Sequence, residues 1–245
     1  GKHPAVILAR HCFAHMDDWR EFMRGIEVLA DKATLVCIEV PYVKDLLERV
    51  EFDSVYHEHL SYVSLKPIVH LLKATPFHIH RIIRYGIHGG ALLMMLRHND
   101  SGITPHLSAD EYLAEENIDK DYWAVFSSNA ESKIEQLRGC VLSKTTDGKI
   151  VSAFGASAKA TVLLNACKFT KKEIAFVTDN SPLKPGCLLP GTDIPIIEEG
   201  QMLSEHPDYA VLTSWNFRDE ILAKMEKWRK RGGRFIIPGK EIEIV

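Results

Sequence analysis

The sequence predicts an α/β chain with two units, each built on its own largely parallel sheet. Three observations favour this fold class. Short apolar segments alternate with segments whose apolar residues recur at helical spacing, and this alternation starts near residue 5 and again near residue 149. A polar, helix-like stretch separates the two series. Each series is long enough for a hydrophobic core of its own. We therefore expect domains at 1–98 and 149–245, joined by a helical connector at 99–148.

The first series begins with an apolar run at 5–9, which is typical of a buried strand. Apolar residues at helical spacing follow in 17–30, where Asp17 and Asp18 favour a helix N-terminus. A βαβ alternation that ends in a hairpin indicates the second half of a doubly wound sheet with an antiparallel last strand. We expect strands at 5–9, 34–40, 77–85 and 91–97, helices at 17–30, near 43–50 and at 66–74, and a hairpin turn at His88-Gly89-Gly90.

The second series follows a stretch of polar helix signals. Ser108 and Glu111 have the S-x-x-E spacing of a capping box, which predicts a helix start, and the helical pattern continues to about Gly139. From Lys149 the alternation of strand and helix resumes and predicts a Rossmann-like α/β layer. We expect strands at 150–154, 173–178, 194–197, 209–213 and 234–237, and helices at 157–167 and 220–231.

Charge and composition exclude several classes of protein. The 245 residues include 30 Lys and Arg against 33 Asp and Glu, a formal net charge of −3, so nothing attracts the whole molecule to nucleic acid or to an anionic membrane. No apolar run reaches the roughly 20 residues that span a bilayer. The five cysteines are scattered and form no CxxC pair, which favours a reducing, cytoplasmic location over a disulfide framework. The sequence indicates no oligomeric state.

The densest cluster of chemically active side chains is the segment 52–62, which reads FDSVYHEHLSY. It follows a predicted strand on the side of the sheet where open α/β folds bind ligands. In an extended segment His57 and His59 share one face. In a helical turn Tyr56 and His59 point the same way, with Glu58 close enough to orient an imidazole. Histidine is a natural general base near neutral pH, and a tyrosine hydroxyl can stabilise an enolate oxygen. The other interpretation is that these side chains cap a loop and satisfy buried polar groups.

A metal site competes with this interpretation, because the chain has 12 histidines. Five of them lie where they can in principle converge: His57, His59, His78, His80 and His88. The His-x-His pairs lack the HExxH spacing and a cysteine partner, which are the usual signs of a zinc site. We therefore predict no metal in this part of the protein.

A second cluster, the segment 155–159 (GASAK), lies between a predicted strand and a predicted helix. Such a turn offers backbone N–H groups and the positive end of a helix dipole to an anion, and Ser157 and Lys159 can add a hydroxyl and a charge. Asp179 ends the next strand 24 residues after Gly155, near the roughly 20 residues at which an acidic side chain binds a ribose in dinucleotide folds. Only one glycine of G-x-G-x-x-G is present, so an NAD-dependent dehydrogenase is poorly supported. A turn that merely packs helix against strand is the structural alternative.

Two further positions follow strands of the second series. Lys184 lies in a loop rich in Pro and Gly and can reach a phosphate or a ribose, although such a loop is often only a connector. Trp215 and Asn216 follow a predicted strand at the same carboxyl edge as Gly155, where they suit a contact with a base or a sugar. A core tryptophan is an equally good interpretation of Trp215.

The segment 52–65, which reads FDSVYHEHLSYVSL, with HGG at 88–90 downstream, resembles the S-adenosylmethionine-dependent sugar C-methyltransferases. The segments 155–159, 179–191 and 215–216 are similar to the C-terminal domain of that family. The resemblance spans nearly the whole chain. It implies that the first unit is the second half of a class I methyltransferase-type doubly wound sheet, and that the second is a Rossmann-like domain for the nucleotide sugar.

The resemblance also implies roles for individual residues. Enzymes of this family methylate a carbon of a keto-deoxysugar that is attached to a nucleoside diphosphate. By similarity, His59 removes the proton next to the ketone, and Tyr56 and Glu58 position or polarise the carbonyl. His15 matches a second active-site histidine. The nucleotide is expected on the second unit, at Gly155, Ser157, Lys159, Asp179, Lys184, Trp215 and Asn216.

The chain departs from the family in two ways. The zinc-binding N-terminal module and the glycine-rich turn that holds the methionine part of the cofactor do not occur in this sequence, which starts at about the fourth strand of the methyltransferase sheet. Arg10 and His11 stand where the family usually has asparagines, at a strand tip near the cofactor. Because the chain opens directly on a strand, we expect it to be the C-terminal portion of a longer enzyme.

The sequence thus predicts the C-terminal portion of a sugar-nucleotide C-methyltransferase. Its cofactor is S-adenosylmethionine, bound mainly upstream and contacted here by Arg10 and His11. Its partner is a nucleoside-diphosphate sugar, with neither nucleic acid nor membrane involved. The alternative is a non-catalytic module that binds a nucleotide sugar and has lost S-adenosylmethionine binding.

Overall fold

The computed structural model describes residues 2–86, 89–106 and 108–245, which form two compact units. Unit 1 contains Gly1–Glu48 and His57–Trp123, and unit 2 contains Arg49–Tyr56 and Ala124–Val245. The chain therefore passes between the units three times. Compared with the expected ranges, unit 2 also includes the short segment Arg49–Tyr56 and part of the connector.

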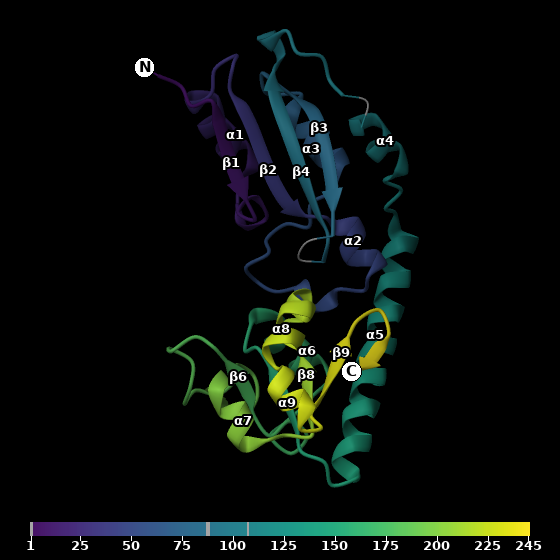
Figure 1. Cartoon of the computed structure of the whole chain (residues 1–245). Coiled ribbons are helices and arrows are strands. Elements are labelled where there is room, and N and C mark those ends of the chain that lie inside the picture. The colour runs from purple at the N-terminus through teal and green to yellow at the C-terminus, as the bar shows by residue number, and fades with distance from the viewer. Residues whose placement is uncertain (1, 87–88, 107) are drawn as a thin grey trace. The chain divides into compact units, whose positions relative to one another are not determined.

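Unit 1 is built on a mixed sheet of four strands, β1 (Val6–Arg10), β2 (Leu35–Pro41), β3 (Phe77–Tyr85) and β4 (Ala91–His98). Their order in space is β1-β2-β4-β3 (Figure 1). β1 and β2 are parallel, whereas β4 is antiparallel to both β2 and β3. Each strand lies where the sequence predicts one, and the hairpin places β4 beside β2 and β3 at the edge.

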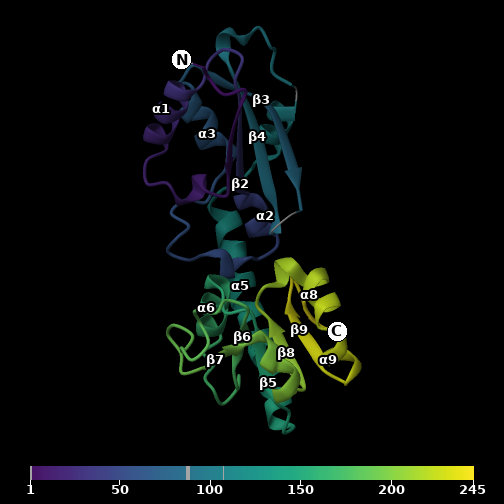
Figure 2. The ribbon, with the colours of Figure 1, turned by 60° about the vertical axis from the view of Figure 1, so that its left-hand side comes forward.

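Helices α1 (Trp19–Leu29) and α3 (Leu65–Leu72) lie on the same side of this sheet (Figure 2). Asp18 is the N-cap of α1 and accepts hydrogen bonds from the N–H groups of Arg20 and Glu21, which satisfies two donors that the helix leaves unpaired. Unit 1 also contains the short helices α2 (Val43–Glu48) and α4 (Ser108–Glu115). The core of unit 1 includes Met23, Ile26, Val36, Ile38, Leu65, Ile68, Met94 and Leu96.

The turn between β3 and β4 is described only in part, because His88 lies outside the described residues. At its described end, Gly90 has φ +122°, and a Cβ there would lie 2.4 Å from the Cβ of Asp45. Only glycine fits this close approach. The buried carboxylate of Asp45 is bonded to Arg84 of β3, with Nη2 2.7 Å from Oδ1. Gly90 therefore packs against an ion pair that joins α2 to β3.

Unit 2 is built on a six-stranded sheet with the order β10-β9-β8-β5-β6-β7. Five strands are parallel, and the last is antiparallel at the edge. The strand expected at 173–178 starts only at Val177, and β10 was not expected. The strands are β5 (Val151–Phe154), β6 (Val177–Asp179), β7 (Ile196–Glu198), β8 (Tyr209–Leu212), β9 (Arg234–Pro238) and β10 (Ile242–Ile244).

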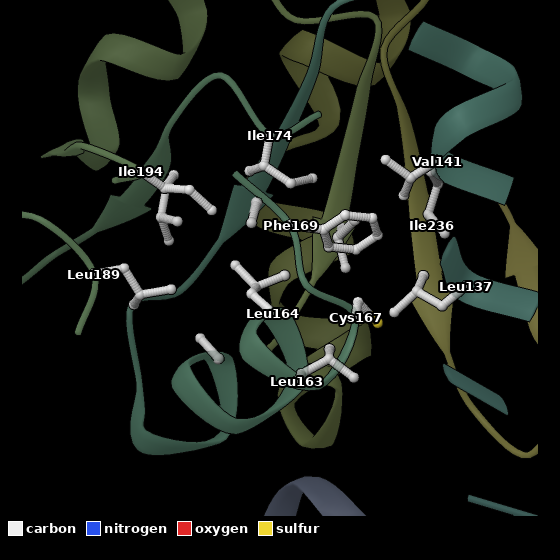
Figure 3. Close-up of a cluster of buried hydrophobic side chains, with 14 of the residues drawn as sticks. Leu137, Val141, Leu163, Leu164, Cys167, Phe169, Ile174, Leu189, Ile194 and Ile236 are labelled. Carbon is white, nitrogen blue, oxygen red and sulfur yellow. The ribbon is translucent and has the colours of Figure 1, made fainter. Parts of the chain in front are cut away.

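The main core of unit 2 is shown in Figure 3. Helix α5 (Lys120–Thr146) contributes Leu137 and Val141, and helix α6 (Ala158–Ala166) contributes Leu163 and Leu164. Val50 and Phe52, from the segment Arg49–Tyr56, belong to the same core. This segment is therefore part of the interior of unit 2.

Two helices, α8 (Arg218–Lys224) and α9 (Glu226–Lys230), occupy the range in which one helix was expected. Met225 between them has φ −94° and ψ +17°, outside helical geometry. Met225 and Trp228 are both buried in a second core of this unit. Tertiary packing here overrides the helical periodicity of the sequence.

In the ranges that the structure describes, none of the helices combines the length and the apolar character needed to cross a membrane.

Candidate active site

The loop 57–61 of unit 1 is attached to the short helix η1 (Phe13–His15), which follows β1. The N–H of Ser61 donates to the carbonyl oxygen of Ala14 at 3.1 Å. Nδ1 of His15 lies 2.5 Å from the carbonyl oxygen of Glu58. A carbonyl oxygen only accepts, so Nδ1 of His15 carries the proton, and in a neutral ring Nε2 is the basic nitrogen. Two hydrogen bonds thus join this loop to η1.

His15 and His59 lie side by side, with ring centroids 5.1 Å apart and ring planes inclined by 48°. His59 is half-buried and His15 is exposed. Both residues therefore keep part of their surface in contact with solvent. The structure therefore brings together two histidines that the sequence predicts at an active site.

His57 and Glu58 form a turn, so the extended arrangement considered for this segment is not present. Tyr56 belongs to unit 2 and is half-buried, whereas His57 and Glu58 belong to unit 1 and are exposed. The contact between Glu58 and His15 is made by the backbone carbonyl of Glu58.

A buried carboxylate, Glu39 of β2, gathers the side chains at the carboxyl ends of β1 and β2. Its side chain is 6% exposed and accepts from Nε of Arg10 at 3.1 and 3.2 Å. Nε2 of His11 lies 2.8 Å from the same carboxylate, and the hydroxyl of Tyr85 also donates to it. Arg10 and His11, which the sequence predicts near a cofactor, are thus joined through Glu39.

These contacts change the pKa values of Glu39 and Tyr85. Burial by itself raises the pKa of Glu39, but the hydrogen bonds from Tyr85 and Arg10 and the charge of His11 outweigh it, so the pKa lies below its usual value. Burial and the bond to Glu39 raise the pKa of Tyr85 to about 12. At neutral pH this site therefore holds an ionised Glu39 and a protonated Tyr85.

In unit 2, Gly155 and Ser157 lie in the turn between β5 and α6. Gly155 has φ +99°, and a Cβ there would lie 2.3 Å from Oγ of Ser214 and 3.2 Å from Oγ1 of Thr213, so the turn needs glycine. Ser157 is the N-cap of α6, and its Oγ accepts a hydrogen bond from the N–H of Ala160 at 3.2 Å. Ser157 thus already satisfies one of the N–H groups at this end of the helix.

Asp179, at the end of β6, is bonded to three donors within unit 2. Oδ2 accepts from the N–H of Ala156 at 2.9 Å and from Nζ of Lys184 at 3.0 Å. Oδ1 accepts from the N–H of Ser181 at 2.9 Å. Burial raises the pKa of Asp179, but these donors outweigh it and hold the pKa below its usual value. Asp179 and Lys184 therefore close the turn after β5.

A crevice of about 290 Å³ opens at the carboxyl ends of β5, β6 and β8. The chain continues from β5 to β6 on one side and returns through β8 on the other, and open α/β sheets bind ligands at such a point. Oγ1 of Thr178 in its wall is buried and makes no hydrogen bond within the described part of the chain. The lining residues include Gly155, Asp179, Asn180, Ser214, Phe217 and Glu220. The volume is at the small end of ligand pockets, which start at roughly 300 Å³.

Lys159 and Trp215 lie together in unit 2, with Nζ of Lys159 4.4 Å from the centroid of the indole ring. Nζ of Lys159 also donates to Oγ of Ser54 at 2.6 Å. Nε1 of Trp215 donates to Oδ2 of Asp53 at 2.6 Å. Asn216, the next residue after Trp215, is half-buried. Lys159 and Trp215, two of the predicted ligands of the nucleotide, are thus bonded to the segment Arg49–Tyr56.

Sequence reasoning missed Glu39, Tyr85 and Asp53. Glu39 did carry a signal, because a single carboxylate in the apolar strand LVCIEVP must be paired when that strand is buried. Asp53 stands inside the most distinctive segment of the chain, but its partner Trp215 comes 162 residues later. No local pattern links two residues so far apart.

Within the described ranges, no three His, Cys, Asp or Glu side chains are grouped so that they can hold a metal ion. Nδ1 of His78 faces Oδ1 of Asn99 at 3.2 Å, and Nδ1 of His80 faces the carbonyl oxygen of Thr104 at 3.1 Å. His88, also considered as a ligand, lies outside the described residues.

Comparison with known proteins identifies the family. A family model described as "C-methyltransferase C-terminal domain" matches residues 86–239. The protein "C-methyltransferase NovU" of Streptomyces niveus is 32% identical over 244 residues, which are 98% of this chain. The chain spans 58% of the length of that relative. The matches to the family model and to this relative show that the chain belongs to the C-methyltransferase family.

Proposed function

We propose that the chain carries the catalytic base and the acceptor site of an S-adenosylmethionine-dependent C-methyltransferase. Its substrate is a nucleoside-diphosphate keto-deoxysugar, methylated on a carbon next to the ketone. The observation that carries the proposal is the pairing of the accessible imidazoles of His15 and His59, 5.1 Å apart, beside a loop bonded to η1. The similarity to a C-methyltransferase supports the reaction class.

In the proposed reaction the imidazole of His59 takes a proton from the carbon next to the ketone. The electrons of that C–H bond form the C=C bond of an enolate, and the carbonyl oxygen takes the negative charge. The hydroxyl of Tyr56 stabilises this oxygen, and Glu58 helps to position the carbonyl. A carbon acid is a poor nucleophile until a base and an oxyanion stabiliser act together, so these residues provide the chemistry that methyl transfer needs.

S-adenosylmethionine, when bound, supplies an electrophilic methyl group on a positively charged sulfur. The cofactor would give up this methyl group to the enolate carbon, its C–S bond would break to leave a neutral thioether, and His59 would then release its proton to solvent. Arg10 fits a contact with the cofactor, because Nε anchors its guanidinium on Glu39 while 54% of the side chain stays exposed. An exposed guanidinium suits a carboxylate such as that of the methionine part. We assign Arg10, with His11 beside it, to this contact.

We assign the nucleoside diphosphate to unit 2. The crevice at Gly155 and Asp179 lies at the edge of the sheet where ligands usually bind. The N-terminus of α6, with Ser157 as its N-cap, and Lys184 beside it favour negatively charged phosphates. The same assignment covers the predicted position Asn216, whereas Lys159 and Trp215 are bonded to the segment Arg49–Tyr56.

Proton exchange tests the base directly. The native protein is incubated in D₂O with a thymidine-diphospho keto-deoxysugar, and deuterium at the carbon next to the ketone is followed by mass spectrometry. His59→Ala and His59→Gln are expected to slow exchange by about 10²- to 10⁴-fold, the usual contribution of a general base. His57→Ala, a matched change on the same exposed turn, is expected to leave exchange near normal. Normal exchange in both His59 variants contradicts the assignment.

Methylation and binding complete the test. With S-adenosylmethionine added, the native protein is expected to transfer a methyl group to the same carbon. Isothermal titration with thymidine diphosphate is expected to give the same affinity for the native protein and for His59→Ala. A protein that binds thymidine diphosphate but neither exchanges nor methylates is instead the non-catalytic module.

A further inference from the structure

The segment Arg49–Tyr56 belongs to unit 2, although the chain on both sides of it belongs to unit 1. It leads directly into the turn that carries the proposed base. Every residue from Val50 to Ser54 is buried, and two of them are acids, Glu51 at 5% and Asp53 at 2% exposure. Buried acids are costly unless they are paired, so specific contacts must hold this segment in place.

The first contact holds a strained residue. Val50 has φ +56°, in the left-handed region that β-branched side chains avoid. Nζ of the buried Lys133, from α5, donates to the carbonyl oxygen of Val50 at 3.1 Å. The same Nζ lies 5.7 Å from the centroid of the Phe52 ring. Such a backbone conformation persists only where its surroundings impose it, and it is often found at functional sites.

The second contact is the bond from Nε1 of Trp215 to Oδ2 of Asp53, at 2.6 Å. Asp53 lies in the short helix η2 (Phe52–Ser54), which packs against α6. Trp215 lies just after β8 at the carboxyl edge of the sheet. A hydrogen bond to a buried carboxylate is among the stronger ones in proteins, so it ties the segment firmly to this edge.

The third contact comes from Lys159 in the first turn of α6. Nζ donates to Oγ of Ser54 at 2.6 Å and lies 4.4 Å from the centroid of the Trp215 ring. Lys159 and Trp215 are therefore held to each other as well as to the segment. Nζ of Lys159 and Nε1 of Trp215 thus both donate to the segment that precedes the proposed catalytic turn.

Electrostatics agree with this arrangement. Burial and the charge of Asp53 raise the pKa of Glu51, whereas the charges of Lys159, Arg49 and Lys133 lower it. Burial dominates and raises the pKa of Glu51 to about 8. At neutral pH Glu51 is therefore mostly protonated and neutral.

We propose that Trp215, Lys159 and Lys133 are positioning residues for the proposed base. Their bonds to the segment 49–56 fix the backbone that ends three residues before His59. This inference rests on the proposed function, because it is the assignment of the base that gives the position of the segment a catalytic meaning. Trp215 and Lys159 act on the reaction through the polypeptide and not through the nucleotide.

Substitutions at the tryptophan–aspartate bond separate the two roles. Trp215→Phe keeps a ring near Lys159 but removes the Nε1 donor. Asp53→Leu removes the acceptor, whereas Asp53→Asn keeps an oxygen in place and serves as the matched control. Relative to the native protein, Trp215→Phe and Asp53→Leu are each expected to lower kcat for methylation by about ten- to a hundredfold, because a small displacement of the base slows the reaction. KM for the sugar nucleotide and Kd for thymidine diphosphate are expected to change by less than about twofold, because no ligand contact is lost.

The Asp53→Asn control is expected to retain most of the activity. The double variant Trp215→Phe with Asp53→Leu is expected to be no slower than the worse single variant, because both changes break the same bond. A raised KM and Kd with kcat unchanged means that Trp215 binds the nucleotide, and it overturns the inference. Unchanged kinetics in both single variants also overturn it.

Hydrogen–deuterium exchange gives a readout that does not depend on activity. Peptides covering 52–60 are expected to exchange faster in Trp215→Phe, while peptides covering β5 and β8 stay protected. Faster exchange throughout unit 2 indicates loss of folding and not loss of positioning, and unchanged exchange in 52–60 overturns the inference. If the proposed base is wrong, His59→Ala stays active while Trp215→Phe still loosens this segment, so the two failures are distinguishable.

Discussion

His15 donates a hydrogen bond from Nδ1 to the backbone carbonyl oxygen of Glu58, and its ring lies beside that of His59. One histidine of the candidate site therefore orients the loop that carries the other. The bond also determines the tautomer of a neutral His15, which presents Nε2 as its basic nitrogen. A role in positioning and a role in proton transfer thus use different nitrogens of the same ring.

Two substitutions of His15 separate these roles. Asparagine places a donor near the position of Nδ1, and glutamine places its amide near that of Nε2. If His15 mainly orients the loop, His15→Asn is expected to keep α-proton exchange within about tenfold of normal. His15→Gln is then expected to lose roughly a hundredfold, the cost of a small misplacement. Rates of deuterium incorporation compare the two, and the opposite ranking assigns proton transfer to His15.

Gly155→Ala is expected to destabilise the protein by about 1–3 kcal/mol, because it combines a left-handed backbone with a clash. The new Cβ would lie 2.3 Å from Oγ of Ser214. Gly139→Ala is the matched control, since nothing lies within 4 Å of a Cβ at that helical position. It is expected to stabilise α5 by about 0.5–1 kcal/mol. Urea unfolding curves measure both, and equal effects contradict the geometry of the turn.

Asp179→Asn is expected to weaken the protein most at neutral pH. The pKa of the folded Asp179 lies below the usual value, so its contribution to stability is complete above about pH 4 and is lost as the pH falls through the lower, folded pKa. The loss at pH 7 is expected to be about 1.5–3 kcal/mol, as for hydrogen bonds to a charged group. Urea unfolding at pH 7 and at pH 3 is the measurement. A difference between the two proteins that does not shrink at the lower pH contradicts the prediction.

Glu51→Gln is expected to stabilise the protein at alkaline pH. Burial raises the pKa of the folded Glu51 to about 8, whereas an unfolded glutamate titrates near about 4.3. The folded state binds more protons between these values, so stability falls as pH rises from about 4 to about 8. At pH 9 the variant is expected to exceed the native protein by a few kcal/mol, and at pH 4 to match it. Glu131→Gln, on the exposed side of α5, is the control. If the stabilities of Glu51→Gln and of the native protein change in parallel with pH, the prediction is wrong.

The regular elements could be predicted because their apolar periods are strong. The buried strands β2 and β4 and the helix α1 with its Asp18 cap lie where the sequence predicts them. β10 could not be predicted, because a half-exposed strand of three residues is specified by its pairing with β9 and not by its composition. The break at Met225 is likewise set by the core into which that side chain packs.

The candidate site was predictable where residues adjacent in sequence act together, and not where the fold joins distant ones. The turn at Tyr56–His59 stands out in the sequence. The bonds from Trp215 to Asp53 and from Lys159 to Ser54 arise only when the segment Arg49–Tyr56 packs into unit 2. The sequence around Lys159 and around Trp215 gives no sign of these bonds, so both residues are predicted from the sequence as ligands for a nucleotide.

The contribution of Val50 and Phe52 to the interior of unit 2 limits how this protein can be dissected or recombined. A fragment of residues 124–245 alone would lack Val50 and Phe52, and a cavity would remain in the core of unit 2. A chimaera that exchanges unit 2 between relatives needs three splice sites, two that flank the segment 49–56 and a third within α5. Substitutions in the segment 49–56 are therefore expected to co-vary with substitutions in 124–245 among natural relatives.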